Sequence, residues 1–403
     1  MWLRLDVTRP DAIARHHILC VVGTRPEIIK MAPVIQELRR RPWAFVSVLS
    51  TAQHRDLSVP LLRLFGIEPD HHLSVMTAGQ SLHRLTTRLL DGLPPVLREV
   101  APDMVLAQGD TTTVMATALA CFYSGIAFGH IEAGLRTGNM RDPFPEEFNR
   151  VMASRTASVN FAPTDQAKRN LLREGVDPGT VFVTGNTVID ALHWVVARGV
   201  PMPVPVARGQ RVLLVTLHRR ESIGAPMRRV FDAVRQLVER NPDLLVIYPL
   251  HPNPLVGDPA RDRLGSLPRV LLCPPLDYPG LIAVLRRSHF VLTDSGGIQE
   301  EAPTFGKPVL VARESTERPE AVDAGVARLV GTDTDRIVAA AQCLLHDPAA
   351  YAEMVRSISP FGDGHASARI ADILAASRHR HRDAASREAQ PSGPVASDFA
   401  GAS

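Results

Sequence analysis

Short apolar runs alternate with amphipathic runs along most of the chain. Runs rich in Val, Ile, Leu and Phe, typical of buried strands, lie at 18–22, 45–49, 104–107, 126–131, 158–161 and 181–183. Apolar residues between them recur at the spacing of a helix over 28–40, 61–65, 82–90 and a stretch that ends at Tyr123, and another helix is expected to begin near 145. This alternation predicts a parallel sheet with helices on both faces.

A segment rich in Pro and Val, 200–210, interrupts the alternation, which then resumes. Such a composition is typical of a semi-rigid connection between domains. Beyond it, a helix is predicted at 227–240 and strands at 211–217, 244–249, 270–272, 289–292 and 309–312. We therefore expect an α/β protein of two doubly wound, Rossmann-like domains, 18–199 and 211–360, that face a central cleft.

The two ends of the chain depart from this pattern. Residues 1–17 carry Arg and Asp without an apolar core, so we interpret them as an N-terminal extension rather than a secretory signal. A helix is expected over 361–378, as a candidate to pack back on the first domain. Residues 379–403 are rich in His and Arg and then in Ala, Ser, Pro and Gly, which predicts a disordered tail.

Composition narrows the class of protein. The 403 residues are 45% hydrophobic and 22% charged, with a net charge of +3, as in ordinary globular proteins. That charge gives no reason to expect a nucleic-acid or membrane partner, and no apolar run is long enough to span a bilayer. The four cysteines, Cys20, Cys121, Cys273 and Cys343, form no C-x-x-C pair. They predict a reduced, cytoplasmic protein without a zinc or redox site.

Polar residues that follow the predicted strands are the first candidates for a site, because ligands of open α/β sheets bind beyond the carboxyl ends of the strands. These residues are Arg25, Asp110, Glu132, His218, His251, Asp294 and Ser295. Asp110 could instead cap the helix that follows it, and His218 could be an ordinary loop histidine. His251, before a proline, is weaker and is left out of the predicted site.

The segment 293–301 is the most informative of these strand ends. Ser295, Gly296 and Gly297 separate a buried strand from a helix, so backbone N–H groups meet the positive end of the helix dipole. That arrangement suits a phosphate, although an ordinary strand–turn–helix joint is the alternative. Glu301, about one turn further, could accept hydrogen bonds from a pair of sugar hydroxyls.

Cations and carboxylates elsewhere complete the candidate site. Arg25 and Lys30 lie at the start of a helix, where positive charge is unfavourable unless an anion offsets it, and Arg318 follows in the second domain. Glu146 lies in a helix first turn, where acidic residues are favoured in any case. The pair at 333 and 335 imitates a metal-binding D-x-D, but we predict that Asp333 is a helix cap. Together these residues suit a nucleotide-sugar, with diphosphate on one domain and sugar on the other.

Six ordered segments, 23–27, 109–113, 130–138, 145–147, 218–221 and 293–301, carry a resemblance. With them the chain resembles the non-hydrolysing UDP-N-acetylglucosamine 2-epimerases from 17 to about 378. The resemblance implies a glycosyltransferase-B-like fold, usually dimeric, that interconverts UDP-N-acetylglucosamine and UDP-N-acetylmannosamine, for polysaccharide precursors, without metal or cofactor. It implies that the functional residues are Arg25, Lys30, Asp110, Glu132, Glu146 and His218, with Arg136, Ser295, Gly296, Gly297, Glu301 and Arg318 on the substrate and UDP.

The implied chemistry accounts for these residue types. The C2 hydrogen is not next to a carbonyl, so the easier path expels UDP from C1 through an oxocarbenium-like state while C2 loses its proton. The resulting 2-acetamidoglucal regains a proton on the other face, and UDP adds back. This route needs an acid and a base that reach C2 from different directions, and donors that hold the diphosphate. We assign Asp110, Glu132 and Glu146 to proton transfer and cation stabilisation, and His218 to the diphosphate.

Two departures from relatives carry expectations. Leu276 and Leu281 stand where some relatives place Gln and Phe near the uracil, which predicts a looser base pocket or one built from backbone. Residues 53–55 match members that a second substrate molecule activates, but Gly79 stands where those members have Arg before Gln80. We therefore predict weak or absent substrate activation.

Four other readings stay open at this point. The chain could be a glycosyltransferase of the same build, or an epimerase for a related sugar such as a UDP-2,3-diacetamido-glucuronic acid. It could also be a hydrolysing epimerase that releases UDP and free N-acetylmannosamine, or a nucleotide-sugar sensor. The several carboxylates favour the non-hydrolysing epimerase over a transferase or a sensor.

Overall fold

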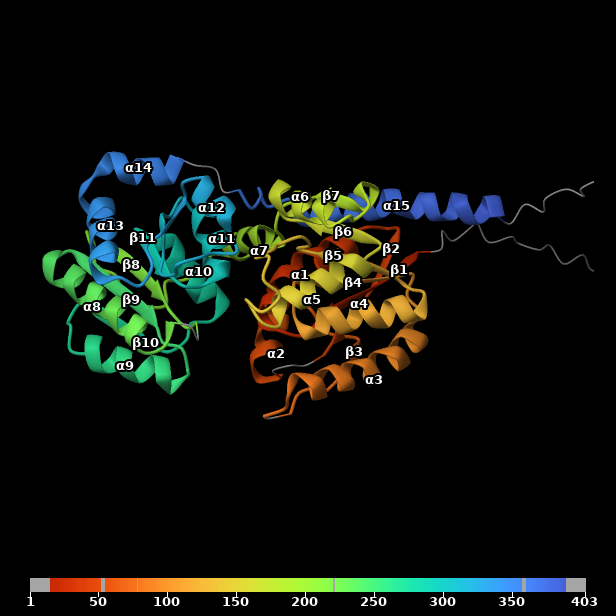
Figure 1. Cartoon of the computed structure of the whole chain (residues 1–403), viewed down its shortest axis with the longest axis horizontal. Helices are drawn as coiled ribbons and strands as arrows, with labels where there is room; N and C mark the ends of the chain where they lie inside the picture. Colours follow the sequence, from red (N-terminus) through yellow and green to blue (C-terminus); the bar gives the residue numbers. More distant parts are fainter. Residues whose placement is uncertain (1–14, 52–54, 78, 220–221, 357–359, 389–403) are drawn as a thin grey trace, which may run out of the picture.

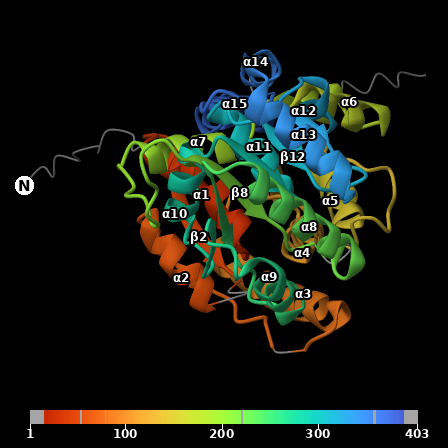
Figure 2. The same ribbon diagram turned by 90° about the vertical axis from the view of Figure 1, so that its left-hand side faces the viewer.

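The computed structural model describes residues 15–51, 55–77, 79–219, 222–356 and 360–388. They form two lobes side by side along the longest axis, each built on a parallel sheet (Figure 1). Helices α14 (Pro348–Arg356) and α15 (Ala366–Glu388) lie along one edge of the molecule, with α3 (Leu82–Val100) and α9 (Pro254–Leu264) along the other (Figures 1 and 2). In the described part of the chain, no helix has the length and apolarity needed to cross a membrane.

The first sheet has seven strands in the order β3-β2-β1-β4-β5-β6-β7. They are β1 (His16–Val22), β2 (Ala44–Ser50), β3 (His71–His72), β4 (Met104–Gln108), β5 (Ala127–Ile131), β6 (Val159–Ala162) and β7 (Val181–Val183). Besides α3, the helices of this lobe are α1 (Arg25–Arg39), α2 (Arg55–Leu64), α4 (Thr112–Ser124), α5 (Glu146–Thr156), α6 (Asp165–Arg173) and α7 (Thr187–Val196). Successive residues of β1 point to opposite faces, so Ile18 and Cys20 enter one core while Leu19 and Val21 enter another. A strand covered on both faces explains its unbroken apolar run.

The second sheet has six strands in the order β10-β9-β8-β11-β12-β13. They are β8 (Arg211–Thr216), β9 (Leu244–Pro249), β10 (Val270–Cys273), β11 (Phe290–Thr293), β12 (Val309–Val311) and β13 (Ala327–Leu329). Besides α9 and α14, its helices are α8 (Ala225–Arg240), α10 (Tyr278–Arg287), α11 (Gly296–Thr304), α12 (Pro319–Asp323) and α13 (Thr334–His346). Every neighbouring pair in both sheets is parallel. The predicted class of two doubly wound α/β units is confirmed.

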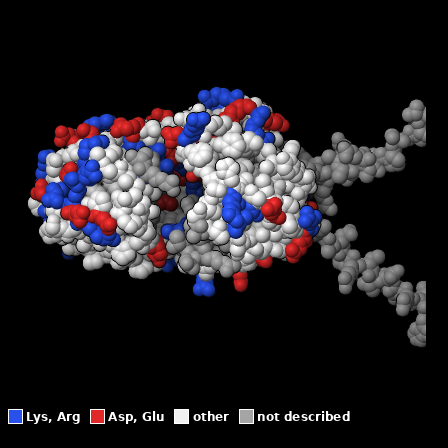
Figure 3. Space-filling model, turned by 60° about the horizontal axis from the view of Figure 1, so that its bottom comes forward, with Lys and Arg blue, Asp and Glu red and all other residues white. Residues whose placement is uncertain are grey.

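Each sheet reverses its strand order once, between β1 and β4 and between β8 and β11. At such a point the loops leaving two neighbouring strands run to opposite faces, which opens a crevice at the carboxyl ends. A hollow between the two lobes is visible in the space-filling view, with acidic and basic side chains inside it (Figure 3). The predicted site residues follow these strands.

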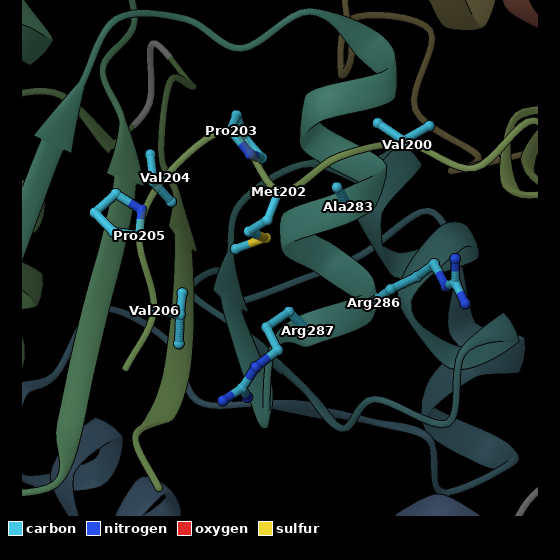
Figure 4. A pocket seen from close by; sticks show the side chains of 9 residues that line it. All are labelled: Val200, Met202, Pro203, Val204, Pro205, Val206, Ala283, Arg286 and Arg287. Atoms are coloured by element: carbon cyan, nitrogen blue, oxygen red, sulfur yellow. The ribbon is translucent and has the colours of Figure 1, made fainter. Parts of the chain in front are cut away.

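The segment 200–210 has no helix or strand and runs beside α10. Together they border an open groove of about 770 Å³, into which Met202 and Ala283 project, with Arg286 and Arg287 at its rim (Figure 4). The groove lies apart from the strand ends that carry the predicted site. The exact limits of the domains on either side of this segment stay predictions.

Three expectations about the elements need correction. The helix expected over 361–378 begins at Ala366 and continues to Glu388, into the segment expected to be disordered, because Ala, Arg and Glu there favour a helix. Residues 389–403 lie outside the described part. The strands β3 and β13 were missed because β3 consists of two histidines and Arg328 interrupts the short apolar run of β13. Helix α3 extends past 90 through two prolines, since Leu85, Leu89, Leu93 and Leu97 continue one buried stripe.

Candidate active site

A buried ion pair, Lys30 with Glu132, lies at the carboxyl end of the first sheet. Burial alone would lower the pKa of Lys30, but the Glu132 and Glu300 carboxylates raise it. Burial alone would raise the pKa of Glu132, but the Lys30 ammonium and the Arg318 guanidinium hold it below its ordinary value. Both groups are therefore charged at neutral pH. Glu132 also has a φ of 64°, a strained backbone for a residue other than glycine.

Charged groups of the second lobe join this pair. Glu300, in α11, lies 3.4 Å from the Lys30 Nζ and accepts from the Arg318 Nε at 2.9 Å. Asn186, at the start of α7, donates from its Nδ2 to Glu132 and to Glu300, each at 3.0 Å. A network of buried hydrogen bonds and ion pairs thus crosses between the two lobes.

Asp110, after β4, is held by two neighbouring residues of α5, one at its carboxylate and one at its backbone oxygen. Arg150 Nη2 lies 2.7 Å from its Oδ2, and the Asn149 Nδ2 donates to its backbone oxygen at 2.9 Å. The alternative reading of Asp110 as a helix cap is wrong, because Thr111 caps α4. Burial raises the pKa of Asp110, and the opposing charge of Arg150 does not offset it.

Glu146 begins α5 and is partly buried, and this burial raises its pKa above the ordinary value. Its neighbour Glu147 faces inward and accepts from the backbone N–H of Thr137 and Gly138. Of the three carboxylates predicted to be catalytic, Glu132 therefore has a lowered pKa, and Asp110 and Glu146 have raised pKa values. Carboxyl groups whose pKa values are pushed apart can divide acid and base roles between them.

The predicted phosphate seat is at the start of α11. Ser295 is the N-cap residue, and its side chain makes no capping bond. A Cβ on Gly296 would lie 3.0 Å from Glu317 Oε1 and 3.1 Å from Arg318 Nη1, so glycine lets the guanidinium approach the helix N-terminus. Glu317 pairs with guanidinium groups at 2.6 to 3.1 Å, and these belong to Arg219, Arg313 and Arg318. Helix dipole and guanidinium groups together suit a diphosphate.

His218 follows β8 and is anchored to Asp294, which follows β11. The Asp294 carboxylate accepts from the backbone N–H of His218 at 2.9 Å and of Arg219 at 2.9 Å, and lies 3.2 Å from the His218 Nδ1. The His218 ring stacks on His251 with centroids 5.9 Å apart. His251 was left out of the predicted site, and it lies near His218 because the two residues follow the neighbouring parallel strands β9 and β8.

Glu301, one turn into α11, is buried beside Tyr278 and Glu300. Burial and the Glu300 charge raise the pKa of Glu301 to about 8. In the described part of the chain, no three His, Cys, Asp or Glu side chains gather as a metal site would require. Asp333 caps α13 by accepting from the Arg336 backbone N–H at 2.9 Å, so its prediction as a cap is confirmed.

A family model described as UDP-N-acetylglucosamine 2-epimerase matches residues 36–375. The chain belongs to the UDP-N-acetylglucosamine 2-epimerase family. It is 47% identical over 367 residues to the UDP-N-acetylglucosamine 2-epimerase of Salmonella typhimurium, with 89% of this chain and 98% of the relative covered. It is 48% identical over 358 residues to that of Bacillus subtilis, covering 89% and 94%. The resemblance seen in the motifs is confirmed.

Solved structures of this epimerase family are similar throughout. The Neisseria meningitidis enzyme bound to UDP-GlcNAc matches with a TM-score of 0.84 and 43% identity, covering 89% of this chain and 99% of that one. The Methanocaldococcus jannaschii enzyme in complex with UDP-GlcNAc and UDP matches with a TM-score of 0.75 and 31% identity, covering 89% and 99%. The glycosyltransferase-B-like fold predicted for the chain is confirmed.

The epimerase motifs come together in part. Lys30 contacts Glu132 directly, and Arg318 joins them through Glu300. Asp110 lies near enough to Glu146 for its charge to contribute to the raised pKa of Glu146. Arg25 begins α1 and is partly buried.

Arg136 lies elsewhere than predicted. Its Nε and Nη2 bind the Glu174 carboxylate at 2.7 and 2.9 Å, so its guanidinium supports the loop after α6.

Three polar residues of the site were missed: Asn186, Arg150 and Glu300. Arg150 lies one turn after Glu146, so helical spacing could have placed both on one face. No spacing pattern in the sequence pointed to Glu300 or Asn186 as site residues.

The two residues expected near the uracil, Leu276 and Leu281, are partly buried and pack against the large hydrophobic core. Residues 53 and 54 of the activation motif lie outside the described part.

Proposed function

We propose that this chain interconverts UDP-N-acetylglucosamine and UDP-N-acetylmannosamine by elimination and re-addition of UDP. The observation that carries the proposal is the contrast among three carboxyl groups at the end of one sheet. Glu132 has a lowered pKa and stays ionised, while burial raises the pKa values of Asp110 and Glu146 and so favours their protonated forms. Solved family members bound to UDP-GlcNAc support the choice of substrate.

The elimination balances with these groups alone. The C1–O bond breaks and its electron pair leaves with UDP, while the C2–H electron pair forms the C1=C2 double bond of 2-acetamidoglucal. A carboxylate takes the C2 proton, and a carboxyl on the other side returns one before UDP adds back. We assign Glu132 to the stabilisation of positive charge at C1 and the two other carboxyls to proton transfer.

The second lobe holds UDP in this proposal. The backbone N–H groups at Ser295, Gly296 and Gly297, with Arg318, bind the diphosphate as it departs, and His218 lies at the end of the neighbouring strand β8 to contact it. Glu301 accepts from the ribose hydroxyls. Lys30, Arg25 and Arg150 add positive charge on the other side of the crevice.

A homodimer is part of the proposal. Large apolar side chains are exposed on neighbouring helices of the first lobe: Phe122 (63%) and Tyr123 (76%) at the end of α4, and Phe148 (45%) and Met152 (39%) on α5. An exposed apolar face of this size supports association with a second copy. Light scattering of the purified protein should give twice the 43.9 kDa chain mass. Phe148→Glu should then shift the mass to that of one chain, whereas a monomeric wild type would contradict the dimer.

We also place the protein in the cytoplasm. Cys20 and Cys121 are buried free thiols, and Cys273 and Cys343 are free as well, which supports a reducing compartment.

The test of the reaction is proton NMR of UDP-N-acetylglucosamine with the purified protein, with EDTA and without nicotinamide cofactor. UDP-N-acetylmannosamine signals that grow to a plateau, without free UDP in proportion, are the expected result. Stoichiometric free UDP and N-acetylmannosamine would instead indicate the hydrolysing reaction. Turnover of a UDP-2,3-diacetamido-glucuronic acid, measured in parallel, should be slower. No new sugar at all would contradict the proposal.

A further inference from the structure

Asn186 occupies a position that no step of the proposed reaction uses. It precedes α7, and its side chain is almost fully buried, with the residue 2% exposed. The Oδ1 accepts from the Val188 backbone N–H at 3.1 Å and so caps the helix. This bond identifies the oxygen end of the side-chain amide, because only the oxygen can accept from an N–H group. The nitrogen, Nδ2, therefore faces the two carboxylates.

The amide nitrogen bridges the two lobes. One proton goes to Glu132, on the loop after β5, and the other to Glu300, in α11 of the second lobe, both at 3.0 Å. Two buried carboxylates this close would repel each other unless donors lay between them. Asn186 and the Lys30 ammonium supply those donors.

The backbone at Asn186 is held just as firmly. Its N–H donates to the Phe361 oxygen at 2.7 Å. Gly185 and Gly362, with φ of +88° and +124°, cross so closely that a Cβ on Gly362 would lie 3.2 Å from the Gly185 Cα. The segment that leads into α15 therefore clamps the start of α7, and the Asn186 side chain has little freedom to move.

We infer that Asn186 is a positioning residue, which ties the Glu132 carboxylate to Glu300 and so to Arg318 at the phosphate seat. Glu132 alone would be a strained residue at the end of a strand with one cation beside it. With the bridge, the carboxylate that faces C1 keeps a fixed place relative to the lobe that holds UDP. The expected effect on catalysis rests on the proposed epimerase reaction, whereas the Asn186 bridge between Glu132 and Glu300 does not depend on that proposal.

Asn186→Ser separates the two roles of the side chain. Serine can still cap α7, but it is too short to reach both carboxylates. The matched control is Asp333→Ser, which makes the same kind of change at the α13 cap, far in sequence from this network. We expect kcat of Asn186→Ser to fall about 10- to 100-fold, as for the loss of a hydrogen bond to a buried charged group. UDP affinity should change less than twofold, because the phosphate seat is untouched, and the control should keep its kcat.

A pH profile distinguishes positioning from a general loss of structure. Glu132 is faced by Lys30 from α1, Glu300 from α11, Arg318 at the start of α12, Asp110 after β4 and His130 within β5. Loss of the Asn186 donor removes a bond that favours the ionised form of Glu132. The acidic limb of kcat against pH should therefore move to higher pH in Asn186→Ser and stay in place in the control.

A double-mutant cycle with Glu300→Gln tests the bridge without turnover. Thermal unfolding of wild type, Asn186→Ser, Glu300→Gln and the double variant should show strong non-additivity, since the two side chains share one contact. Additive unfolding effects would overturn the inference, as would a wild-type kcat and acidic limb in Asn186→Ser. If the wild type converts no UDP-N-acetylglucosamine, the proposed function fails, while the unfolding cycle still decides whether the bridge exists. If Asn186→Ser does not fold, Asn186→Asp, which keeps the cap and loses the donor, takes its place in both measurements.

Discussion

Arg150 Nη2 lies 2.7 Å from Asp110 Oδ2, and the Arg150 side chain is only 4% exposed. A buried guanidinium this close to the Asp110 carboxylate fixes the direction in which that carboxylate points. The Arg150 Nη1 lies 3.5 Å from the Glu147 Oε2, so the same guanidinium joins the Asp110 and Glu147 carboxylates. The guanidinium thus holds a candidate proton carrier in place beside a second buried carboxylate.

Replacement of this guanidinium tests its role. Arg150→Lys keeps the charge but not the planar fork, so Asp110 loses its fixed orientation. We expect kcat to fall about 10- to 100-fold, equivalent to about 1.5–3 kcal/mol for a hydrogen bond to a charged group. Arg155→Lys is the control, because Arg155 is on the same helix and donates to the Glu174 backbone oxygen instead. Equal rates for wild type and Arg150→Lys would contradict the role.

UDP binding should depend on pH through Glu301. Its pKa is about 8, so its carboxyl is mostly protonated at pH 7 in the ligand-free protein. The ionised form accepts better from ribose hydroxyls, and therefore UDP affinity should rise about tenfold between pH 7 and pH 9. Calorimetry in buffers of different ionisation enthalpy should show a proton released on binding near pH 7. Glu301→Gln should bind UDP weakly, and its UDP affinity should not change with pH. If the affinity of this variant still rises with pH, another group must cause the rise.

Gly297 offers a test of the phosphate seat. A Cβ there meets nothing closer than the Ser295 Oγ at 4.0 Å, so alanine fits the ligand-free protein. Alanine in a helix is favoured over glycine by roughly 0.5–1 kcal/mol, and unfolding of Gly297→Ala should occur at the same or a higher temperature. If phosphate needs that space, UDP affinity should nevertheless fall at least tenfold. Unchanged affinity would mean that the diphosphate lies elsewhere.

Substrate activation should be weak or absent, because Gly79 stands where activated relatives carry Arg. Initial rates against UDP-N-acetylmannosamine, with and without a trace of UDP-N-acetylglucosamine, should follow hyperbolic curves that nearly coincide. Strongly sigmoidal curves would show that other residues supply the second site.

Sequence patterns were sufficient for the fold class because most of the buried strands are short, mainly apolar runs, although β3 and β13 were missed. The same patterns located the strand ends, and with them Glu132, Asp110 and the seat at Ser295, since chain order places these residues at the carboxyl edge. Sequence patterns could not predict which side chains of different helices and strands contact each other. Asn186 and Glu300 meet only because α7 and α11 pack across the two lobes, and no spacing along the chain reports that packing.

Arg136 shows that a residue within a sequence motif need not have its side chain in the site. It lies within a motif of the family, yet its guanidinium turns to Glu174, which is distant in sequence. Arg150, outside the segment chosen for the motif, occupies the place beside Asp110 instead. A motif fixes the path of the backbone near a site, whereas tertiary partners decide which of its side chains enter that site.

Hydrogen exchange at C2 tests the elimination most directly. UDP-N-acetylglucosamine is incubated with the protein in deuterated water, and the C2 proton signal is followed by NMR as UDP-N-acetylmannosamine forms. Elimination and re-addition require deuterium at C2 of the product, and Glu132→Gln should slow both exchange and conversion by orders of magnitude. Conversion with complete retention of the C2 proton would contradict the account, because no free proton would then have left the sugar.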